Sequence, residues 1–185
     1  MNSLGQHGRS WLDYVLISNI HTAEDEGMLA ANGITHVYSL LEFPSPPLDL
    51  SSVMHKLQIK HRYVRIDDCE TADILAVGRK WYRQIDRDRR EPRARILFHC
   101  AAGQSRSASL LLYHLMRSWR MPFHRAYQIL KDARPEVLPN LGFFRQLRDW
   151  DQTAQSMRYL LGCEALFILH KAHKSRSLYT RLNQR

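Results

Sequence analysis

The sequence predicts an α/β fold in which a central sheet, mostly parallel or mixed, is flanked by helices on both faces. Two observations support this fold class. Short apolar runs alternate with segments of helical periodicity in the first part of the chain, and helical segments alone follow them. The chain has 185 residues, of which 44% are hydrophobic, so a sizeable core can form within one domain.

The elements before the middle of the chain are defined by apolar runs and their flanking polar residues. Thr22 and Asp25 are spaced like a capping box, which predicts a helix from Thr22 to Asn32, and Gly33 suits the position after it. Three prolines at 44, 46 and 47 indicate a surface loop. Buried or alternating strands are predicted over residues 14–17, 34–40 and 60–66.

The later elements include one more strand and four helices. Apolar residues at helical spacing predict a helix over residues 73–88, and residues 96–98 read as a buried strand. A helix over residues 107–119 follows the next loop. Pro122 suits the first turn of another helix, which ends before Arg134 and Pro135, and Asn140 is a good cap for a final helix.

The segment His-Cys-Ala-Ala-Gly-Gln-Ser-Arg-Ser at residues 99–107 lies between the last predicted strand and a helix start. A helix N-terminus attracts anions, and the guanidinium of Arg106 suits two oxygens of a phosphate. Gly103 suits the tight backbone reversal that lets the loop N–H groups converge. The predicted phosphate-binding residues are therefore Ala101, Ala102, Gly103, Gln104, Ser105 and Arg106.

Cys100 is the predicted nucleophile of this loop. A free cysteine has a pKa of about 8.5, and the loop N–H groups, the helix N-terminus and Arg106 all favour the thiolate that attacks. The hydroxyl of Ser107 can donate a hydrogen bond to the sulfur, and we expect His99 to brace the loop by hydrogen bonding. The alternative is that Cys100 is merely a small buried residue after a strand.

A cysteine nucleophile inside a phosphate-binding loop is typical of a phosphatase. Such an enzyme also needs a proton donor for the leaving oxygen of the substrate. Asp67 and Asp68 follow a predicted strand, on a loop where a carboxyl group can reach the mouth of a neighbouring strand. Adjacent residues point in opposite directions, so we expect only one of the two to serve. The alternative is that the pair forms an ordinary turn and helix cap.

The signature at residues 99–107 resembles that of cysteine-based protein tyrosine phosphatases, and further landmarks narrow the resemblance. Over about residues 12–150 the chain is similar to the small, atypical dual-specificity protein phosphatases. The landmarks are Gly33-Ile34-Thr35-His36-Val37, Leu115-Met116, Ala133-Arg134-Pro135 and Pro139-Asn140-Leu141-Gly142-Phe143.

This resemblance implies a phosphatase that works through a cysteinyl-phosphate intermediate with no metal or cofactor. It implies Cys100 as nucleophile, Arg106 as phosphate clamp, Ser107 as thiolate partner and Asp68 as general acid, with Asn140 supporting the loop. It also implies a shallow pocket that admits phosphoserine and phosphothreonine as well as phosphotyrosine. The expected organisation is a flexible N-terminus at 1–11, a catalytic domain at 12–156 and a basic extension at 157–185.

Three other functions remain open. A non-enzymatic phosphoprotein-binding module or scaffold would need to lack the nucleophile or the clamp, and neither is missing. An inositide phosphatase usually carries basic residues in the loop, where this chain has the neutral Ala101, Ala102 and Gln104. An RNA 5′-phosphatase would be favoured by the basic charge, but its loop usually resembles His-Cys-Thr-His-Gly.

The formal net charge is +9, and many of the arginines lie at 79–95. This stretch is either a docking site for an acidic or phosphorylated partner or a solvated helix face. Cys69 is either a small buried residue or a redox partner of Cys100. We expect phosphorylated protein substrates, no nucleic acid and no membrane span, and a cytoplasmic or nuclear location, because the three cysteines are scattered and no secretory signal is present.

Overall fold

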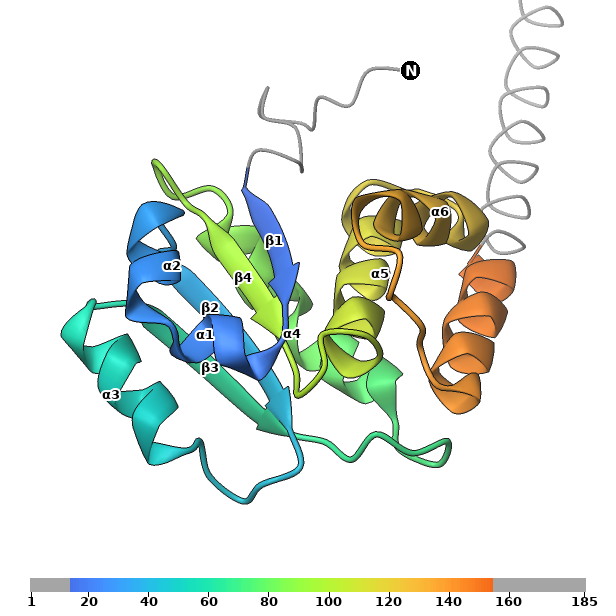
Figure 1. The fold of residues 1–185 in the computed structure, drawn as a ribbon. Coiled ribbons are helices and arrows are strands. Elements are labelled where there is room, and N and C mark those ends of the chain that lie inside the picture. Colours follow the sequence, from blue (N-terminus) through green and yellow to red (C-terminus); the bar gives the residue numbers. More distant parts are fainter. Residues whose placement is uncertain (1–13, 155–185) are drawn as a thin grey trace, which may run out of the picture. The chain divides into compact units, whose positions relative to one another are not determined.

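The computed structural model describes residues 14–154 (Figure 1). The expected flexible N-terminus at 1–11 and basic extension at 157–185 lie outside the described residues. The chain divides into two units, Met1–Arg148 and Asp149–Arg185. The architecture below is that of the first unit, and residues 149–154 of the second are helical.

The described part of the first unit contains one four-stranded sheet (Figure 1). Its strands are β1 (Val15–Ser18), β2 (His36–Leu41), β3 (Lys60–Arg65) and β4 (Ile96–His99), in the order β1-β4-β2-β3. All three pairings are parallel, which confirms the predicted fold class. The carboxyl ends of all four strands therefore meet at one edge of the sheet, and the amino ends at the other.

Helices cover both faces of the sheet (Figure 1). Val37 and Leu97 belong to an apolar cluster with residues of the short helices α1 (Ile20–Glu24), α2 (Glu26–Ala31) and α3 (Leu48–Lys56). The residues that follow them in sequence, Tyr38 and Phe98, point to the opposite face of the sheet, as strand geometry requires. There Tyr38 stacks on Phe98 with ring centroids 5.3 Å apart, and the Trp81 ring of α4 (Ile74–Asp88) meets Tyr38 edge-on.

Helix α5 (Arg106–Ser118) is the central helix of the second face, and its residues 106–116 are all buried. It lies between α4 and α6 (Phe123–Ala133), which explains why it is buried on every side. A Cβ on Gly78 would lie 2.6 Å from the Tyr113 ring, so α4 and α5 approach closely at this glycine. Burying a leucine such as Leu112 contributes about 2 kcal/mol, so α5 anchors the loop before it.

One sequence prediction of local structure was wrong, and one helix was missed. Residues 22–32 do not form one helix with a Thr22–Asp25 capping box. Asn19 caps α1 by accepting from the Thr22 N–H at 3.0 Å, and Asp25 caps α2 by accepting from the Met28 N–H at 2.9 Å. Helix α3 was not predicted, although Leu50 and Met54, both buried, have the spacing of one helix face.

The other elements match their predictions within a few residues. Gly33 has a φ of 59°, a left-handed conformation suited to the residue after a helix. Asn140 caps the helix that starts at residue 141, because its Oδ1 accepts from the Phe143 N–H at 2.9 Å. Within residues 14–154, no helix has the length and apolar character that crossing a bilayer would require.

Candidate active site

The loop between β4 and α5 is pressed against the connection that follows β1. The Ile20 N–H donates to the carbonyl oxygen of Ala101 at 3.1 Å. Gly103 has a φ of 70°, and a Cβ at this position would overlap the carbonyl group of Ser18. Because only glycine combines this conformation with this close approach, Gly103 fixes the path of the loop.

The sulfur of Cys100 is surrounded by hydrogen-bond donors. The Gly103 N–H donates to Sγ at 3.2 Å and the Ser107 hydroxyl at 3.3 Å, while the cysteine itself is 1% exposed. Burial alone raises the pKa of the thiol, but hydrogen bonds from Ser107 and Gly103 and the charge of Arg106 outweigh burial. The pKa of Cys100 therefore lies below its ordinary value, which favours the thiolate.

Arg106 lies under the loop with its guanidinium buried. Its Nη1 donates to Oε2 of Glu42 at 3.1 Å and to the carbonyl oxygen of Ile66 at 3.3 Å. Its Nε lies 3.6 Å from Oδ2 of Asp68 and has no hydrogen-bond partner among residues 14–154. A buried donor without a partner is costly, and an oxyanion in the loop would satisfy it.

The structure brings Asp68 to the loop and leaves Asp67 away from it. Oδ1 of Asp68 accepts from the Ser105 hydroxyl at 2.6 Å and from Nδ2 of Asn140 at 2.8 Å. The backbone N–H of Asn140 donates in turn to Ser105 Oγ at 3.0 Å. Asp67 is exposed, and its side chain makes no hydrogen bond or ion pair within the described part of the chain.

A chain of polar side chains, buried at Ser39 and His99, leads from β3 to the loop. Ser39 Oγ lies 2.5 Å from Nε2 of His99 and 2.7 Å from Nε2 of His61, and His99 Nδ1 lies 3.4 Å from the Cys100 carbonyl oxygen. Burial lowers the pKa of both imidazoles to about 4, so both are neutral at pH 7. Since a carbonyl only accepts, His99 Nδ1 carries the proton, and its Nε2 accepts from the Ser39 hydroxyl.

Sequence reasoning missed three residues that contact this machinery: Ser39, Glu42 and the side chain of Arg134. Glu42 directly follows β2, and its place at the carboxyl edge was the available signal. Arg134, recognised only as a helix end and a landmark, donates from Nε to the Gly103 carbonyl at 3.2 Å and from Nη2 to the Ala102 carbonyl at 3.3 Å. These contacts hold the loop from the side of α6.

Cys69 differs from the reading that took it as a small buried residue. Its side chain is exposed, with Sγ 3.4 Å from the Thr71 hydroxyl, and both Cys69 and Cys100 are free thiols. Cys69 is therefore not part of the core, and its thiol is open to solvent.

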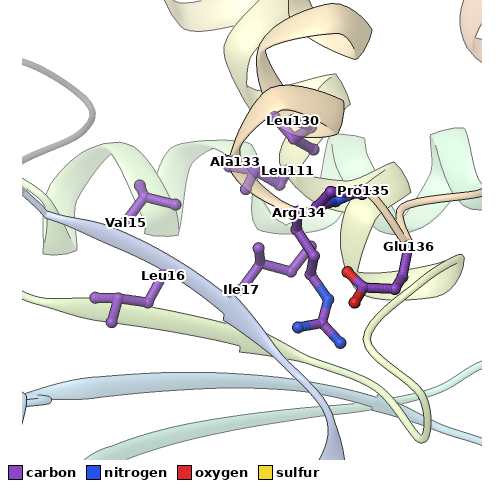
Figure 2. A pocket seen from close by; sticks show the side chains of 9 residues that line it. All are labelled: Val15, Leu16, Ile17, Leu111, Leu130, Ala133, Arg134, Pro135 and Glu136. Carbon is purple, nitrogen blue, oxygen red and sulfur yellow. The ribbon is translucent and has the colours of Figure 1, made fainter.

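Two of the surface pockets have similar volumes. One, of about 460 Å³, opens beside Asp68 and includes two leucines that are 63% and 57% exposed, Leu138 and Leu141. The other, of about 450 Å³, lies beside β1. Figure 2 shows that its walls are mostly apolar and that the charged ends of Arg134 and Glu136 extend along one side of it. The first pocket adjoins the polar groups described above, whereas the second contains no candidate catalytic side chain.

Comparison with known proteins matches residues 15–153 to the family model described as dual specificity phosphatase, catalytic domain. The chain belongs to this family. The protein-tyrosine-phosphatase MKP1 of Arabidopsis thaliana is 32% identical over 135 residues, which is 73% of this chain and 16% of that protein. The chain thus spans only a small part of the length of this curated relative.

Solved structures give the same family. The crystal structure of DUSP15 has a TM-score of 0.68 and 25% sequence identity, and the match covers 83% of this chain and 94% of that one. The Yvh1 phosphatase domain of Chaetomium thermophilum has a TM-score of 0.66 and 27% identity, over 77% of this chain and 92% of that one. This chain therefore contains nearly all of the dual-specificity phosphatase fold seen in these structures.

Proposed function

We propose that this chain is a dual-specificity protein phosphatase that hydrolyses phosphotyrosine and phosphoserine or phosphothreonine. The observation that supports it best is the sulfur of Cys100, at the start of the loop between β4 and α5. This sulfur accepts hydrogen bonds from Gly103 and Ser107, and the pKa of the thiol is lowered. A thiolate beside a buried arginine is the arrangement that nucleophilic attack on a bound phosphate needs.

In the first step the thiolate of Cys100 attacks phosphorus, an S–P bond forms and the P–O bond to the leaving group breaks. Arg106 holds two phosphate oxygens through its Nε and a terminal nitrogen, while the N–H groups of residues 101–106 face the others. Asp68 gives its proton to the leaving oxygen. Its Oδ1 is engaged by Ser105 and Asn140, which leaves Oδ2 for this proton.

In the second step water attacks phosphorus of the cysteinyl phosphate, and the S–P bond breaks. Asp68, now a carboxylate, accepts the proton of the water. The Ser107 hydroxyl donates a hydrogen bond to the departing sulfur, which stabilises the thiolate as it leaves. His99 and Ser39 act as positioning residues through the backbone of Cys100.

The expected substrates are phosphorylated proteins. The Asp68 side chain is 32% exposed, which supports a shallow site open to short and long phosphorylated side chains. Leu138 and Leu141 offer apolar contacts to residues that flank the phosphorylated one. The cytoplasmic or nuclear location stays a prediction, as does a redox role for Cys69.

The docking role of the basic stretch 79–95 also stays a prediction. Arg79 pairs with Asp73, and Arg89 and Arg90 both pair with Asp86. The exposed pairs of Arg79 and Arg90 favour the alternative of a solvated helix face at these two positions, whereas Arg89 is only 9% exposed. Doubling the salt concentration would weaken docking and raise KM for a phosphoprotein substrate, whereas an unchanged KM would remove the docking proposal.

The binding-module alternative is tested by turnover of p-nitrophenyl phosphate by the full chain. We expect the wild type to turn over and Cys100→Ser to lose about 10⁴-fold or more in kcat, because the nucleophile is removed. Cys69→Ser is the matched control and should retain activity. A wild type that binds phosphopeptides without releasing phosphate, or an active Cys100→Ser variant, would refute the proposal. Phosphopeptides, inositol phosphates and 5′-triphosphorylated RNA compared at equal concentration separate the remaining substrate classes.

A further inference from the structure

Three potential metal ligands meet at the amino edge of the sheet, at the opposite end of the strands from Cys100. They are His36 at the start of β2, Asp88 at the end of α4 and Glu91 in the turn that follows. His36 Nε2 lies 3.9 Å from Asp88 Oδ1 and 3.5 Å from Glu91 Oε2. One ligand atom from each residue lies within 4.8 Å of the other two.

The imidazole of His36 presents an unsatisfied nitrogen to this cluster. The residue is 1% exposed, and its Nε2 has no hydrogen-bond partner among the described residues. Its Nδ1 lies 2.8 Å from the Thr35 hydroxyl, which donates its single proton to the Arg95 carbonyl oxygen at 3.2 Å. When Nδ1 carries the ring proton and donates it to Thr35, the lone pair of a neutral Nε2 faces two carboxylates. A lone pair that faces two carboxylates is unfavourable when buried, and a cation bound between the three groups would stabilise them.

The residues behind these three hold them in place. Asp88 Oδ1 accepts from Nε2 of Gln84 at 2.6 Å, and Oδ2 accepts from the Tyr38 hydroxyl at 2.5 Å. Together with the bond from His36 to Thr35, these contacts orient an imidazole and a carboxylate as outer partners do in metal sites. Lys60 bonds both oxygens of Glu91, but the lysine is 52% exposed and can swing into water when a cation binds.

We propose that His36, Asp88 and Glu91 bind one zinc ion. Zinc takes histidine nitrogen and carboxylate oxygen at about 2.0–2.2 Å, so tetrahedral ligand atoms lie about 3.3–3.6 Å apart. The two carboxylate oxygens lie 3.5 Å and 3.9 Å from Nε2, which small side-chain shifts would bring to that spacing. The exposed side of Glu91 leaves a fourth position for water. The ion ties the end of α4 to the start of β2, so it has a structural role and takes no part in phosphate chemistry.

Thermal unfolding of the full chain tests this site independently of phosphatase activity. The experiment uses as the parent protein a variant in which Cys69, Cys100 and Cys163 are all replaced by serine, because zinc also binds thiolates. Zinc at a hundredfold excess over its Kd should raise Tm by about 5 °C or more, and EDTA should reverse the shift. Isothermal titration with Zn²⁺ should give one site.

Glu91→Gln in that parent should abolish the zinc-dependent shift. Its matched control is Glu26→Gln: both glutamates are 41% exposed and pair with a lysine, but Glu26 pairs with Lys56 on α3 and belongs to no such cluster. The control should keep the full shift. The absence of a shift in the parent, or equal shifts in Glu91→Gln and Glu26→Gln, would overturn the proposal.

Discussion

The two edges of the sheet assemble polar groups in different ways. At the carboxyl edge, Cys100, Arg106 and Ser107 come from eight consecutive residues, and the Gly103 N–H of the same loop donates to the sulfur. At the amino edge, His36, Asp88 and Glu91 come from two distant segments and meet through side chains alone. A contiguous loop can be recognised in a sequence, whereas a cluster built by topology can be found only in the fold.

The largest effect that would sharpen this comparison is expected from Asp68→Asn at the carboxyl edge. Removing the proposed proton donor should lower kcat/KM about 10²–10⁴-fold for alkyl phosphates such as phosphoserine peptides. Aryl phosphates should lose much less, because their leaving oxygen needs less protonation. Steady-state kinetics on both substrate types measure the difference, with Asp67→Asn as the matched control. If Asp67→Asn shows the selective loss instead, the general acid was misassigned.

Acid should destabilise the protein through histidines buried as neutral rings. Burial lowers the pKa of His99 to about 4 and that of His114 to about 3, whereas an unfolded histidine titrates near 6.5. The unfolded state therefore binds more protons below pH 6.5, and the free energy of unfolding falls as pH drops towards 4.

Each of these two rings should cost about 2 kcal/mol at pH 5 relative to pH 7.5. Urea unfolding at both pH values measures the loss. His114→Asn should reduce the pH dependence of stability by one proton, and an unchanged dependence would contradict this assignment.

At the amino edge, Tyr38→Phe should lower stability and leave catalysis intact. The hydroxyl of Tyr38 donates to the buried carboxylate of Asp88, and its loss should lower the free energy of unfolding by about 1–3 kcal/mol. The kcat for p-nitrophenyl phosphate should stay within about twofold. If kcat fell together with stability, the two edges of the sheet would be coupled, and this prediction would be wrong.

The smallest effect is expected from the apolar side of the site. Leu138→Ala together with Leu141→Ala should raise KM for phosphopeptides by about threefold to tenfold, because apolar contact with flanking residues is lost. The KM for p-nitrophenyl phosphate, which has no flanking residues, should not change. Equal changes for both substrates would show that the leucines shape the loop itself instead of contacting the peptide.

Sequence reasoning predicted the strand, the loop and the helix at the carboxyl edge because their signals are local. The strand, the loop and the helix start follow one another in the sequence, and the spacing of Cys100, Gly103 and Arg106 determines the geometry of the loop. Choosing between Asp67 and Asp68 required the resemblance, since two adjacent carboxylates give the same local signal. In the structure only Asp68 contacts Ser105 and Asn140.

The parts that were missed depend on tertiary contacts or on competing local signals. Asn19 competes with Thr22 as a helix cap, and the direction of the chain after β1 decides between them. Helix α3 follows a proline-rich loop and is short, so its two buried residues gave a weak periodic signal. Ser39 reads as an ordinary strand residue until the sheet order places it between His61 and His99.

The pH dependence of Cys100 alkylation tests the central claim most directly. Iodoacetate reacts with the thiolate, and peptide mass spectrometry can follow Cys100 and Cys69 in the same sample. We expect Cys100 to react fully at mildly acidic pH and Ser107→Ala to move its titration to higher pH, because a donor to Sγ is lost. A Cys100 that titrates near 8.5 like a free cysteine, in the wild type and in Ser107→Ala alike, would contradict the account.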